Sequence, residues 1–385
     1  MREYLQAENI QLVYSGNNYF DLLEQIINES KEILHFQTYI FDTDNTGMRI
    51  VAALKRAAAR NVSVYLLVDA FGSGSFSKHV AKDLSDCGIH FRKYAPLFSP
   101  ESIYFGRRLH YKIIVADKKT ALTGGINIAD KYNNNSDTQP WLDYAIHTKG
   151  RVCEYLDLLC EETYKKQKIS FLEKWEKSKA KHNNLTKEKL ISFRLNDWIK
   201  NKNEIHTSYI RQLLKAKKSI TIVASYFLPG NRFRKLLAGA AARGVVVKII
   251  LTGKSDVSSV RLAEIYLYAF YLRNKIQLYE WSNSVMHGKA MIVDEEWATV
   301  GSFNINFLSR YISIELNTDI LDTKFATQFA THLEEITNSG CTLIEQNTLK
   351  HKSQWYNQLR MWLAYYFFLL LMDVTINRRR RKIKN

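Results

Sequence analysis

Cysteine is scarce in this chain of 385 residues, and no apolar run opens it. The four cysteines, Cys87, Cys153, Cys160 and Cys341, form no C-x-x-C pair and no spacing typical of a zinc site. We therefore expect free thiols in a reducing compartment rather than a disulfide framework. The opening segment MREYLQAENIQLVYSG contains no continuous apolar stretch, so we expect no secretory signal and place the body of the protein in the cytosol.

Acidic side chains are in the minority: 38 Asp and Glu stand against 55 Lys and Arg, which gives a formal charge of +17. This excess favours a polyanionic partner, either nucleic acid or an anionic membrane surface, and charge alone does not choose between them. Apolar residues make up 46% and charged residues 24%, as in soluble globular proteins with real cores. The length leaves room for two domains or two fused half-domains.

What the chain does contain is one pattern written twice, H-x-K-x4-D-x6-G-[GS]-x-N. The first copy comprises His110, Lys112, Asp117, Gly124, Gly125 and Asn127. The second copy comprises His287, Lys289, Asp294, Gly301, Ser302 and Asn304. A single H-x-K pair is common, but two copies with the same downstream spacing indicate one site built from two halves.

The residues around the two motifs also repeat, and this predicts the fold. Segment 33–40 (ILHFQTYI) corresponds to 220–228 (ITIVASYFL), and 54–69 corresponds to 237–252. The second pair reads as an alanine-rich helix, a short turn and a buried strand of β-branched residues. We expect an α/β protein with two pseudosymmetric α/β/α sandwich domains, whose mostly parallel central sheets pack face to face around one active site.

The expected domain boundaries follow from this repeat and from composition. Residues 1–160 would form the first domain and residues 191–350 the second. Residues 161–190, between them, are rich in lysine and glutamate and read as a linker or a solvated helix. Residues 351–385 form a separate apolar and basic C-terminal segment.

An H-x-K spacing puts histidine and lysine on the same face of a strand, because side chains alternate along it. His110, Lys112, His287 and Lys289 are therefore the expected catalytic residues of a single cleft. Such a cleft suits a phosphodiester: the lysines neutralise its oxygens, one imidazole attacks phosphorus, and the other protonates the leaving alcohol. No compact carboxylate cluster accompanies the motifs, so we expect neither a metal nor another cofactor.

The remaining small and polar motif residues are expected to support the phosphate. The amides of Asn127 and Asn304 would add hydrogen bonds to its oxygens. Gly125 and Ser302 occupy matching places just before these asparagines and are assigned to the same phosphate-binding group.

Four carboxylates are expected to act around the motifs rather than on the substrate. A nucleophilic imidazole needs a partner on its far nitrogen, and Asp143 and Glu315 lie shortly downstream of the two motifs. Asp117 and Asp294 fall on the opposite strand face from the lysines. We expect these two to be structural and to fix the turn after each strand.

At these residues the chain resembles the phospholipase D (HKD) superfamily and is most similar to its bacterial cardiolipin synthase branch. The resemblance covers roughly residues 10–345. Besides the two motifs, it includes the phrases TYIFDTDNTG (38–47), LLVDAFGSGSF (66–76), WLDYAI (141–146), ASYFLPG (224–230) and LTGKSDV (251–257). The duplicated motif is highly specific for the superfamily, and the other phrases are moderately specific for the branch.

The resemblance implies a ping-pong transphosphatidylation through a phosphohistidine. The first-motif histidine, His110, would attack, and His287 would act as the general acid and base. The donor would be phosphatidylglycerol or another glycerophospholipid. The acceptor would be the hydroxyl of a second phosphatidylglycerol, so that glycerol is released.

The chain departs from the family pattern at several places. Gly125 stands where the second motif has Ser302, which leaves only a backbone N–H at that point. After the second motif, Asn306 replaces the acid that members often carry, and Arg310 falls two places late. These changes bear on acceptor preference rather than on the core chemistry. We also expect the chain to lack the N-terminal transmembrane helices that many synthases carry.

The C-terminal segment predicts how the protein meets a membrane. Residues 361–372 (MWLAYYFFLLLM) carry no charge, and RRRRKIK follows at 378–384. As a helix, this apolar run rises only about 18 Å, short of a hydrocarbon core of about 30 Å. We expect residues 361–384 to lie on an anionic membrane surface, at the cytoplasmic face of the cell membrane, as a peripheral or monotopic anchor. A buried C-terminal helix with a basic tail is the alternative.

Other functions remain open on the sequence. Water as the acceptor would make the protein a phospholipase D, and the charge of +17 would suit an HKD-family nuclease. The apolar C-terminal run and the synthase-like phrases argue against nucleic acid as the partner. A non-enzymatic lipid-binding scaffold would not require paired histidines. The sequence makes no prediction of oligomeric state.

Overall fold

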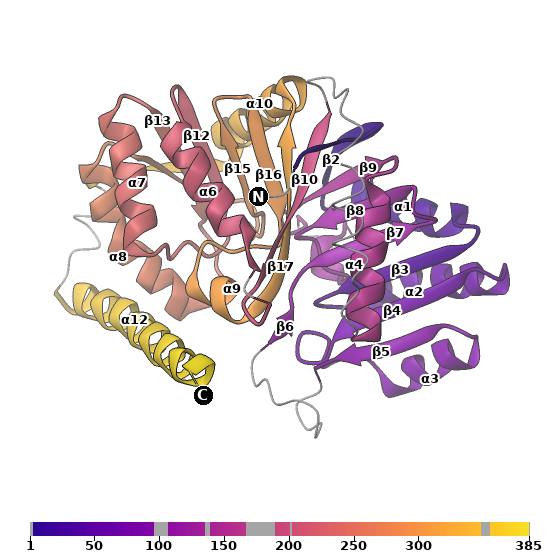
Figure 1. Ribbon diagram of the computed structural model, residues 1–385. Coiled ribbons are helices and arrows are strands. Elements are labelled where there is room, and N and C mark those ends of the chain that lie inside the picture. Colours follow the sequence, from indigo (N-terminus) through magenta and orange to yellow (C-terminus); the bar gives the residue numbers. More distant parts are fainter. Residues whose placement is uncertain are drawn as a thin grey trace.

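The computed structural model describes residues 3–95, 107–134, 139–166, 189–200, 202–347 and 355–384. Most of the linker expected at 161–190 therefore lies outside the described residues. Two β-sheets stand side by side with helices on their outer faces (Figure 1). This confirms the expected two-domain α/β architecture.

The first sheet has seven strands in the order β2-β9-β8-β7-β3-β4-β5. In that order the strands are Asn9–Tyr14, Tyr144–Lys149, Thr120–Gly124, Lys112–Ala116, Ile33–Thr38, Ser63–Asp69 and His90–Tyr94. The helices of this half are α1 (Asn17–Glu29), α2 (Asn45–Ala59), α3 (Lys78–Asp86), the short 3-10 helix η1 (Asp130–Tyr132) and α4 (Cys153–Lys165). Their apolar faces cover the sheet, as shown by buried Phe20 and Leu23 in α1 and Ile50 and Leu54 in α2.

The second sheet follows the order β1-β10-β17-β16-β15-β12-β13-β14-β18, with β11 beside β10 and β6 beside β17. In that order the strands are Leu5–Gln6, Leu190–Asp197, Ser313–Leu321, Trp297–Gly301, Ala290–Val293, Ser219–Ala224, Val246–Thr252, Gln277–Trp281 and Cys341–Ile344, followed by Lys202–Asn203 (β11) and Arg108–Leu109 (β6). The helices are α6 (Glu204–Lys215), α7 (Asn231–Ala242), α8 (Ser258–Arg273), α9 (Phe307–Tyr311), α10 (Thr323–Gly340) and α12 (Trp355–Lys384).

The repeat read from the sequence is a repeat of structure. The order β3-α2-β4-α3-β5-β7-β8-β9 in the first half recurs as β12-α7-β13-α8-β14-β15-β16-β17 in the second. Lys112 begins β7 in the first half, and Lys289 immediately precedes β15 in the second. The two motif copies therefore occupy equivalent places in the two sheets.

The expectation of mostly parallel sheets is wrong. Only β3-β4-β5 and β12-β13-β14 run parallel in the two repeats, whereas the strands from β7 to β9 and from β15 to β17 are antiparallel. The reason is the tight turn after each motif strand, where Asp117 and Lys118, and likewise Asp294 and Glu295, have positive φ. Such a turn joins antiparallel neighbours, because a parallel pair needs a long crossover connection.

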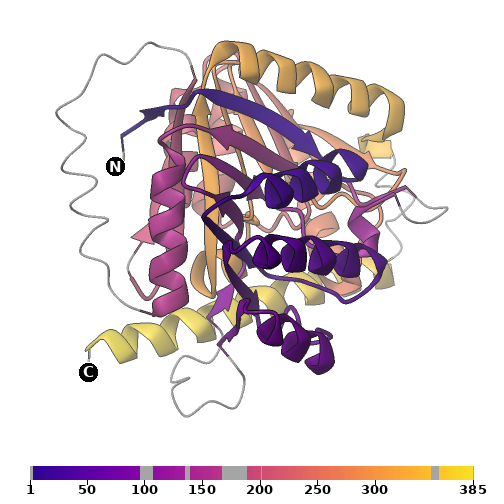
Figure 2. The same cartoon turned by 90° about the vertical axis from the view of Figure 1, so that its right-hand side faces the viewer.

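The two halves share one hydrophobic core. Tyr144 and Ile146 of β9 belong to the same buried cluster as Val223 of β12 and Phe329 of α10. Helix α10, which runs along the top of the molecule in Figure 2, contacts strands of the second sheet and also β2 of the first. The ring centroids of Tyr144 and Phe329 are 5.2 Å apart. Strand β1 lies in the second sheet and β6 pairs with β17, so chain segments also cross between the halves. The four-part division at 160, 190 and 350 stays a prediction.

Helix α12 packs along α8 at the edge of the second half (Figure 1). Tyr365 is buried and stacks on Tyr266 of α8 at 4.8 Å between ring centroids. Phe368 contacts Phe307 of α9 at 6.4 Å. Within the described part of the chain, no helix combines the length and apolarity needed to cross a membrane.

Candidate active site

The backbone holds both motif histidines at the boundary between the two halves. The amide N–H of His110 donates to the carbonyl of Ile314 on β17, at 3.0 Å. The amide N–H of His287 donates to the carbonyl of Leu142, just before β9, at 2.8 Å. The backbone of each histidine is thus fixed by the backbone of the opposite half, at the seam between the sheets.

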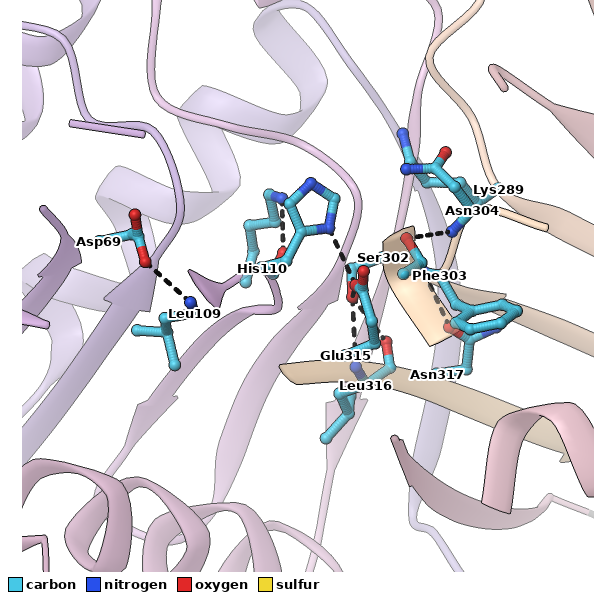
Figure 3. Close-up of polar contacts among 12 residues, drawn as sticks. Asp69, Leu109, His110, Lys289, Ser302, Phe303, Asn304, Glu315, Leu316 and Asn317 are labelled. Atoms are coloured by element: carbon cyan, nitrogen blue, oxygen red, sulfur yellow. Dashed lines mark hydrogen bonds and ion pairs between the residues drawn. The ribbon is translucent and has the colours of Figure 1, made fainter. Parts of the chain in front are cut away.

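His110 is held by a carboxylate from the second half. Its Nδ1 lies 2.9 Å from Oε2 of Glu315, a fully buried residue of β17. The hydroxyl of Ser302 donates to the same oxygen at 2.5 Å, so the carboxylate is fixed from two sides (Figure 3). This contact orients the ring and leaves Nε2 as the nitrogen that can reach a substrate.

His287 is held by a carboxylate from the first half. Its Nδ1 lies 2.6 Å from Oδ2 of Asp143, 2.9 Å from Nζ of Lys289 and 3.3 Å from the hydroxyl of Tyr132. Nδ1 cannot donate to Asp143 and accept from Lys289 at once, and the shorter distance assigns its proton to the Asp143 contact. The two histidine–carboxylate pairs therefore cross between the halves in opposite directions.

The motif lysines are buried beside the histidines that precede them. Nζ of Lys112 donates to the carbonyl of His110 at 2.7 Å, and Nζ of Lys289 donates to the carbonyl of His287. Burial, and then the charge of Lys289, lowers the pKa of Lys112 to about 7. Burial lowers the pKa of Lys289 to about 8, against the opposing charges of Asp143 and Glu315.

The pKa shifts of the other groups show that the two motifs share one electrostatic environment. Burial lowers the pKa of His287 well below its usual value, and the charges of Lys289, Lys112 and His110 lower it further. Burial also lowers the pKa of His110, while Glu315 opposes the shift. Burial raises the pKa of Asp143 to about 6. Charges in each half thus shift the pKa values of groups in the other half. An anion bound among the histidines and lysines would stabilise their protonated forms.

The two motif asparagines make different contacts. Oδ1 of Asn127 accepts the amide N–H of Ile40 at 3.1 Å, and its Nδ2 donates to the Tyr132 hydroxyl at 2.9 Å. Oδ1 of Asn304 accepts the hydroxyl of Ser225 at 2.8 Å, and within the described residues its Nδ2 has no hydrogen-bond partner. Both N–H donors of Asn304 are therefore open to a ligand, whereas Asn127 has already used one of its two.

The motif aspartates lie away from the site. Asp117 accepts the backbone N–H groups of Lys31, Glu32 and Ile33, at 2.8 to 3.0 Å. In the second half, Asp294 accepts those of residues 217, 218 and 219, at 2.7 to 3.2 Å. Both carboxylates therefore tie the turn after the motif strand to the start of its antiparallel neighbour, β3 in the first half and β12 in the second.

Sequence reasoning missed several residues that shape the site. Asp69, at the end of β4, accepts the N–H of Leu109, and Thr252, at the end of β13, accepts the N–H of Met286. Both thereby hold the residue just before a motif histidine. In the sequence, these two residues occupy matching positions at the ends of the repeated segments 54–69 and 237–252. The match is not obvious, because one residue is Asp and the other is Thr.

Aromatic residues also border the motif groups. The ring of Tyr39 meets His110 edge-on at 4.7 Å and lies 5.3 Å from Nζ of Lys112. Tyr132 and Trp141 contact the ring of His287 at 5.4 and 5.9 Å. Among the described residues, no group of three or more His, Cys, Asp or Glu side chains is arranged to hold a metal ion.

Comparison with known proteins gives consistent matches in sequence and in structure. The family model described as "Cardiolipin synthase, PLD-like domain" matches residues 23–139 and 209–337. Cardiolipin synthase B of Shigella flexneri is 31% identical over 94% of this chain and 88% of its own length. The major cardiolipin synthase of Bacillus subtilis is 26% identical over 86% of this chain and 69% of its own.

A solved structure resembles the whole fold. The phosphatidylserine synthase of Haemophilus influenzae superimposes with a TM-score of 0.72, over 97% of this chain and 96% of its own, at 13% sequence identity. At that identity the likeness bears on the fold alone.

Proposed function

The chain belongs to the phospholipase D superfamily, in its cardiolipin synthase branch, and we propose that it transfers a phosphatidyl group from one phosphatidylglycerol to another and releases glycerol. The observation that carries this proposal is the crossed pairing of two histidines. His110 pairs with Glu315, and His287 pairs with Asp143. Both imidazoles are thereby held beside the two motif lysines. A nucleophile and a proton donor are thereby held for a single phosphodiester.

In the first step, Nε2 of His110 attacks phosphorus and forms an N–P bond, while the bond from phosphorus to the glycerol oxygen breaks. Glu315 accepts a hydrogen bond from the Nδ1–H of His110 and stabilises the positive charge that the ring acquires. His287 gives the Nε2 proton to the departing oxygen. The bound phosphate anion raises the pKa of His287 and so favours the protonated form needed here.

In the second step, the hydroxyl of another phosphatidylglycerol attacks the phosphohistidine. His287 removes the hydroxyl proton, a P–O bond forms, and the N–P bond to His110 breaks. The products are cardiolipin and free His110, and the proton on His287 restores the starting state. Asp143 holds the His287 ring in place through both steps.

The lysines and asparagines stabilise the charge on the non-bridging oxygens. Lys112 and Lys289 lie buried beside the two histidines, where their charge is worth more than in water. Nδ2 of Asn304 adds a hydrogen bond, whereas Asn127 mainly positions Tyr132 next to His287. We assign the positive charge of the site to these lysines and propose no resident metal or cofactor.

The proposed substrate lies in a membrane, and helix α12 presents an apolar face that could contact one. Along α12, exposed Leu359, Leu363, Phe367 and Leu370 recur at helical spacing on the face opposite buried Tyr365. Tryptophan and tyrosine accompany this face, and basic residues follow at 378–384. We infer that α12 lies on an anionic bilayer as a peripheral or monotopic anchor, at the cytoplasmic face of the cell membrane.

The function is tested by incubating the purified chain with phosphatidylglycerol vesicles and separating the lipid products. Formation of cardiolipin and glycerol, unchanged by excess chelator, is the expected result. Phosphatidic acid as the sole product would assign a phospholipase D instead. Cleavage of added DNA without lipid turnover would assign a nuclease.

A further inference from the structure

Tyr226 is fixed beside the second motif by its two chain neighbours. The hydroxyl of Ser225 donates to Oδ1 of the motif residue Asn304 at 2.8 Å. The amide N–H of Phe227 donates to Glu264, a buried carboxylate of α8, at 2.6 Å. Because both flanking residues are tied to the protein, the Tyr226 ring has a defined place next to the site.

The hydroxyl of Tyr226 in turn holds an exposed carboxylate. It donates to Oδ1 of Asp256, in the loop between β13 and α8, at 2.5 Å. In the described part of the chain, no lysine or arginine forms an ion pair with Asp256. A carboxylate offers about four acceptor positions, so the bond to Tyr226 leaves most of them open to a ligand.

Asp256 lies within electrostatic reach of the second motif. Burial lowers the pKa of Lys289 to about 8, and Asp256 is among the negative charges that oppose this shift. Asp256 also opposes the lowering of the pKa of His287, which burial and the charge of Lys289 cause. Its carboxylate is therefore a negative group at the border of a site that is otherwise built to bind an anion.

The first half has a neutral residue at the matching position. Asp69 and Thr252 are equivalent, because each accepts the N–H of the residue before a motif histidine. Four residues further along lie Ser73 and Asp256, respectively. The Ser73 hydroxyl donates to the carbonyl of Tyr39 and accepts the N–H of Phe41, so it is used within the fold. The two halves therefore differ at this position, and the carboxylate lies in the half that contains His287.

A carboxylate beside a phosphate site repels the phosphate but accepts hydrogen bonds from neutral hydroxyls. A ligand that carries both a phosphate and hydroxyl groups can place the phosphate among the lysines and a hydroxyl against the carboxylate. A glycerol headgroup has this chemistry, and a simple alcohol has only the one hydroxyl that reacts.

We propose that Asp256, held by Tyr226, forms a hydroxyl-binding subsite that recognises the glycerol moiety of the alcohol entering or leaving on the His287 side. The inference rests on the proposed phosphatidyl transfer and names the residue that makes it selective for a polyol. Asp256 accepts a hydrogen bond from a glycerol hydroxyl that takes no part in the reaction. His287 meanwhile exchanges a proton with the reacting hydroxyl.

The test is a competition between two soluble alcohols of equal carbon number. The full chain is incubated with phosphatidylglycerol vesicles and equal concentrations of deuterated glycerol and 1-propanol. Mass spectrometry gives the ratio of labelled phosphatidylglycerol to phosphatidylpropanol, which does not depend on the amount of active protein. Asp256→Asn and Tyr226→Phe are compared with the wild type. Asp42→Asn is the matched control, since Asp42 pairs with Ser75 in a loop of the first half.

We expect the wild type and Asp42→Asn to prefer glycerol, and Asp256→Asn to lose about tenfold of that preference. Tenfold corresponds to about 1.4 kcal/mol, close to the value of a hydrogen bond to a charged group. Tyr226→Phe should lower the ratio less, because it frees the carboxylate without removing it. An unchanged ratio in Asp256→Asn, or an equal loss of both products, would overturn the subsite. If the wild type forms no lipid product at all, the proposed function fails, and the subsite with it.

Discussion

Gly125 and Ser302, the point at which the two motif copies differ, each fit the carboxylate beside them. A Cβ added at Gly125 would lie 2.4 Å from Oδ1 of Asp143, so only glycine leaves room for the carboxylate that holds His287. Ser302 instead donates to Glu315, the carboxylate that holds His110. The sequence marked this difference as a departure, but its cause lies in contacts that only the folded chain creates.

Gly125→Ala tests whether this close approach matters for turnover. The added methyl group should push Asp143 away from His287 and lower the rate of transfer at least tenfold. Gly230→Ala is the control, because no atom lies within 4 Å of a Cβ built there and its turnover should stay at the wild-type level. Steady-state rates on phosphatidylglycerol vesicles provide the measurement, and equal rates in the two variants would refute the role of Asp143.

The pH dependence of kcat/KM follows from the pKa shifts of three buried groups. Activity should rise through about pH 6 as Asp143 ionises and becomes able to hold His287. It should fall above pH 7 to 8 as Lys112 and Lys289 lose the protons that bind the phosphate. Lys112→Arg keeps the positive charge and should move the falling limb to higher pH. A rate constant that is flat from pH 5 to 9 would contradict this assignment.

At the scale of elements, each motif strand and the turn after it form a unit anchored by an aspartate. Asp117 and Asp294 make the same three backbone contacts in the two halves, to the first residue of β3 or β12 and the two residues before it. Both have positive φ, near 52° and 56°, which Asp and Asn tolerate better than most residues. The third letter of the H-K-D pattern therefore serves the fold.

Asp294→Asn should weaken the protein without changing its chemistry. Replacing a charged acceptor of three N–H groups should lower the free energy of unfolding by about 2 kcal/mol. Urea denaturation measures this, with Glu295→Gln in the same turn as the control. The pH profile of the folded fraction should stay as in the wild type, and a changed profile would show that Asp294 acts in the site.

The sequence predicted the elements better than their pairing. Strand β3 and nearly all of β12 fall within the repeated segments 33–40 and 220–228, because apolar periodicity reflects local burial. The segments 54–69 and 237–252 contain the ends of α2 and α7 and the strands that follow them. The antiparallel run from β7 to β9 was missed, since it depends on a turn with two positive φ angles. Asp143 and Glu315 could be named as candidates from their residue type and position. That each pairs with the histidine of the opposite half depends on tertiary contacts, which no local sequence pattern contains.

The exposed face of α12 yields a prediction about membrane binding. Deleting residues 355–385 should weaken sedimentation with anionic liposomes while sparing turnover of a soluble phosphodiester. The triple change Leu363→Ser, Phe367→Ser and Leu370→Ser should have the same effect, because these side chains are 53, 56 and 63% exposed and do not support the fold. Unchanged sedimentation of both variants would remove α12 as the anchor.

At the scale of the molecule, the two halves form one functional body. A single buried cluster spans both sheets, and the hydroxyls of Thr123 and Thr318 meet across the seam at 2.8 Å. Each histidine takes its carboxylate, and a backbone hydrogen bond, from the opposite half. Neither half holds a complete set of the proposed catalytic groups, so we expect one transfer site per chain.

A burst experiment with a phosphatidyl p-nitrophenyl ester tests this most directly. Its leaving group needs no proton, so His287→Ala should complete the first step and stall at the second. We expect a burst of one nitrophenolate per chain in His287→Ala, with the phosphatidyl group on His110, and no burst in His110→Ala. Two equivalents per chain, or a burst in His110→Ala with the adduct on His287, would contradict a single shared site with His110 as its nucleophile.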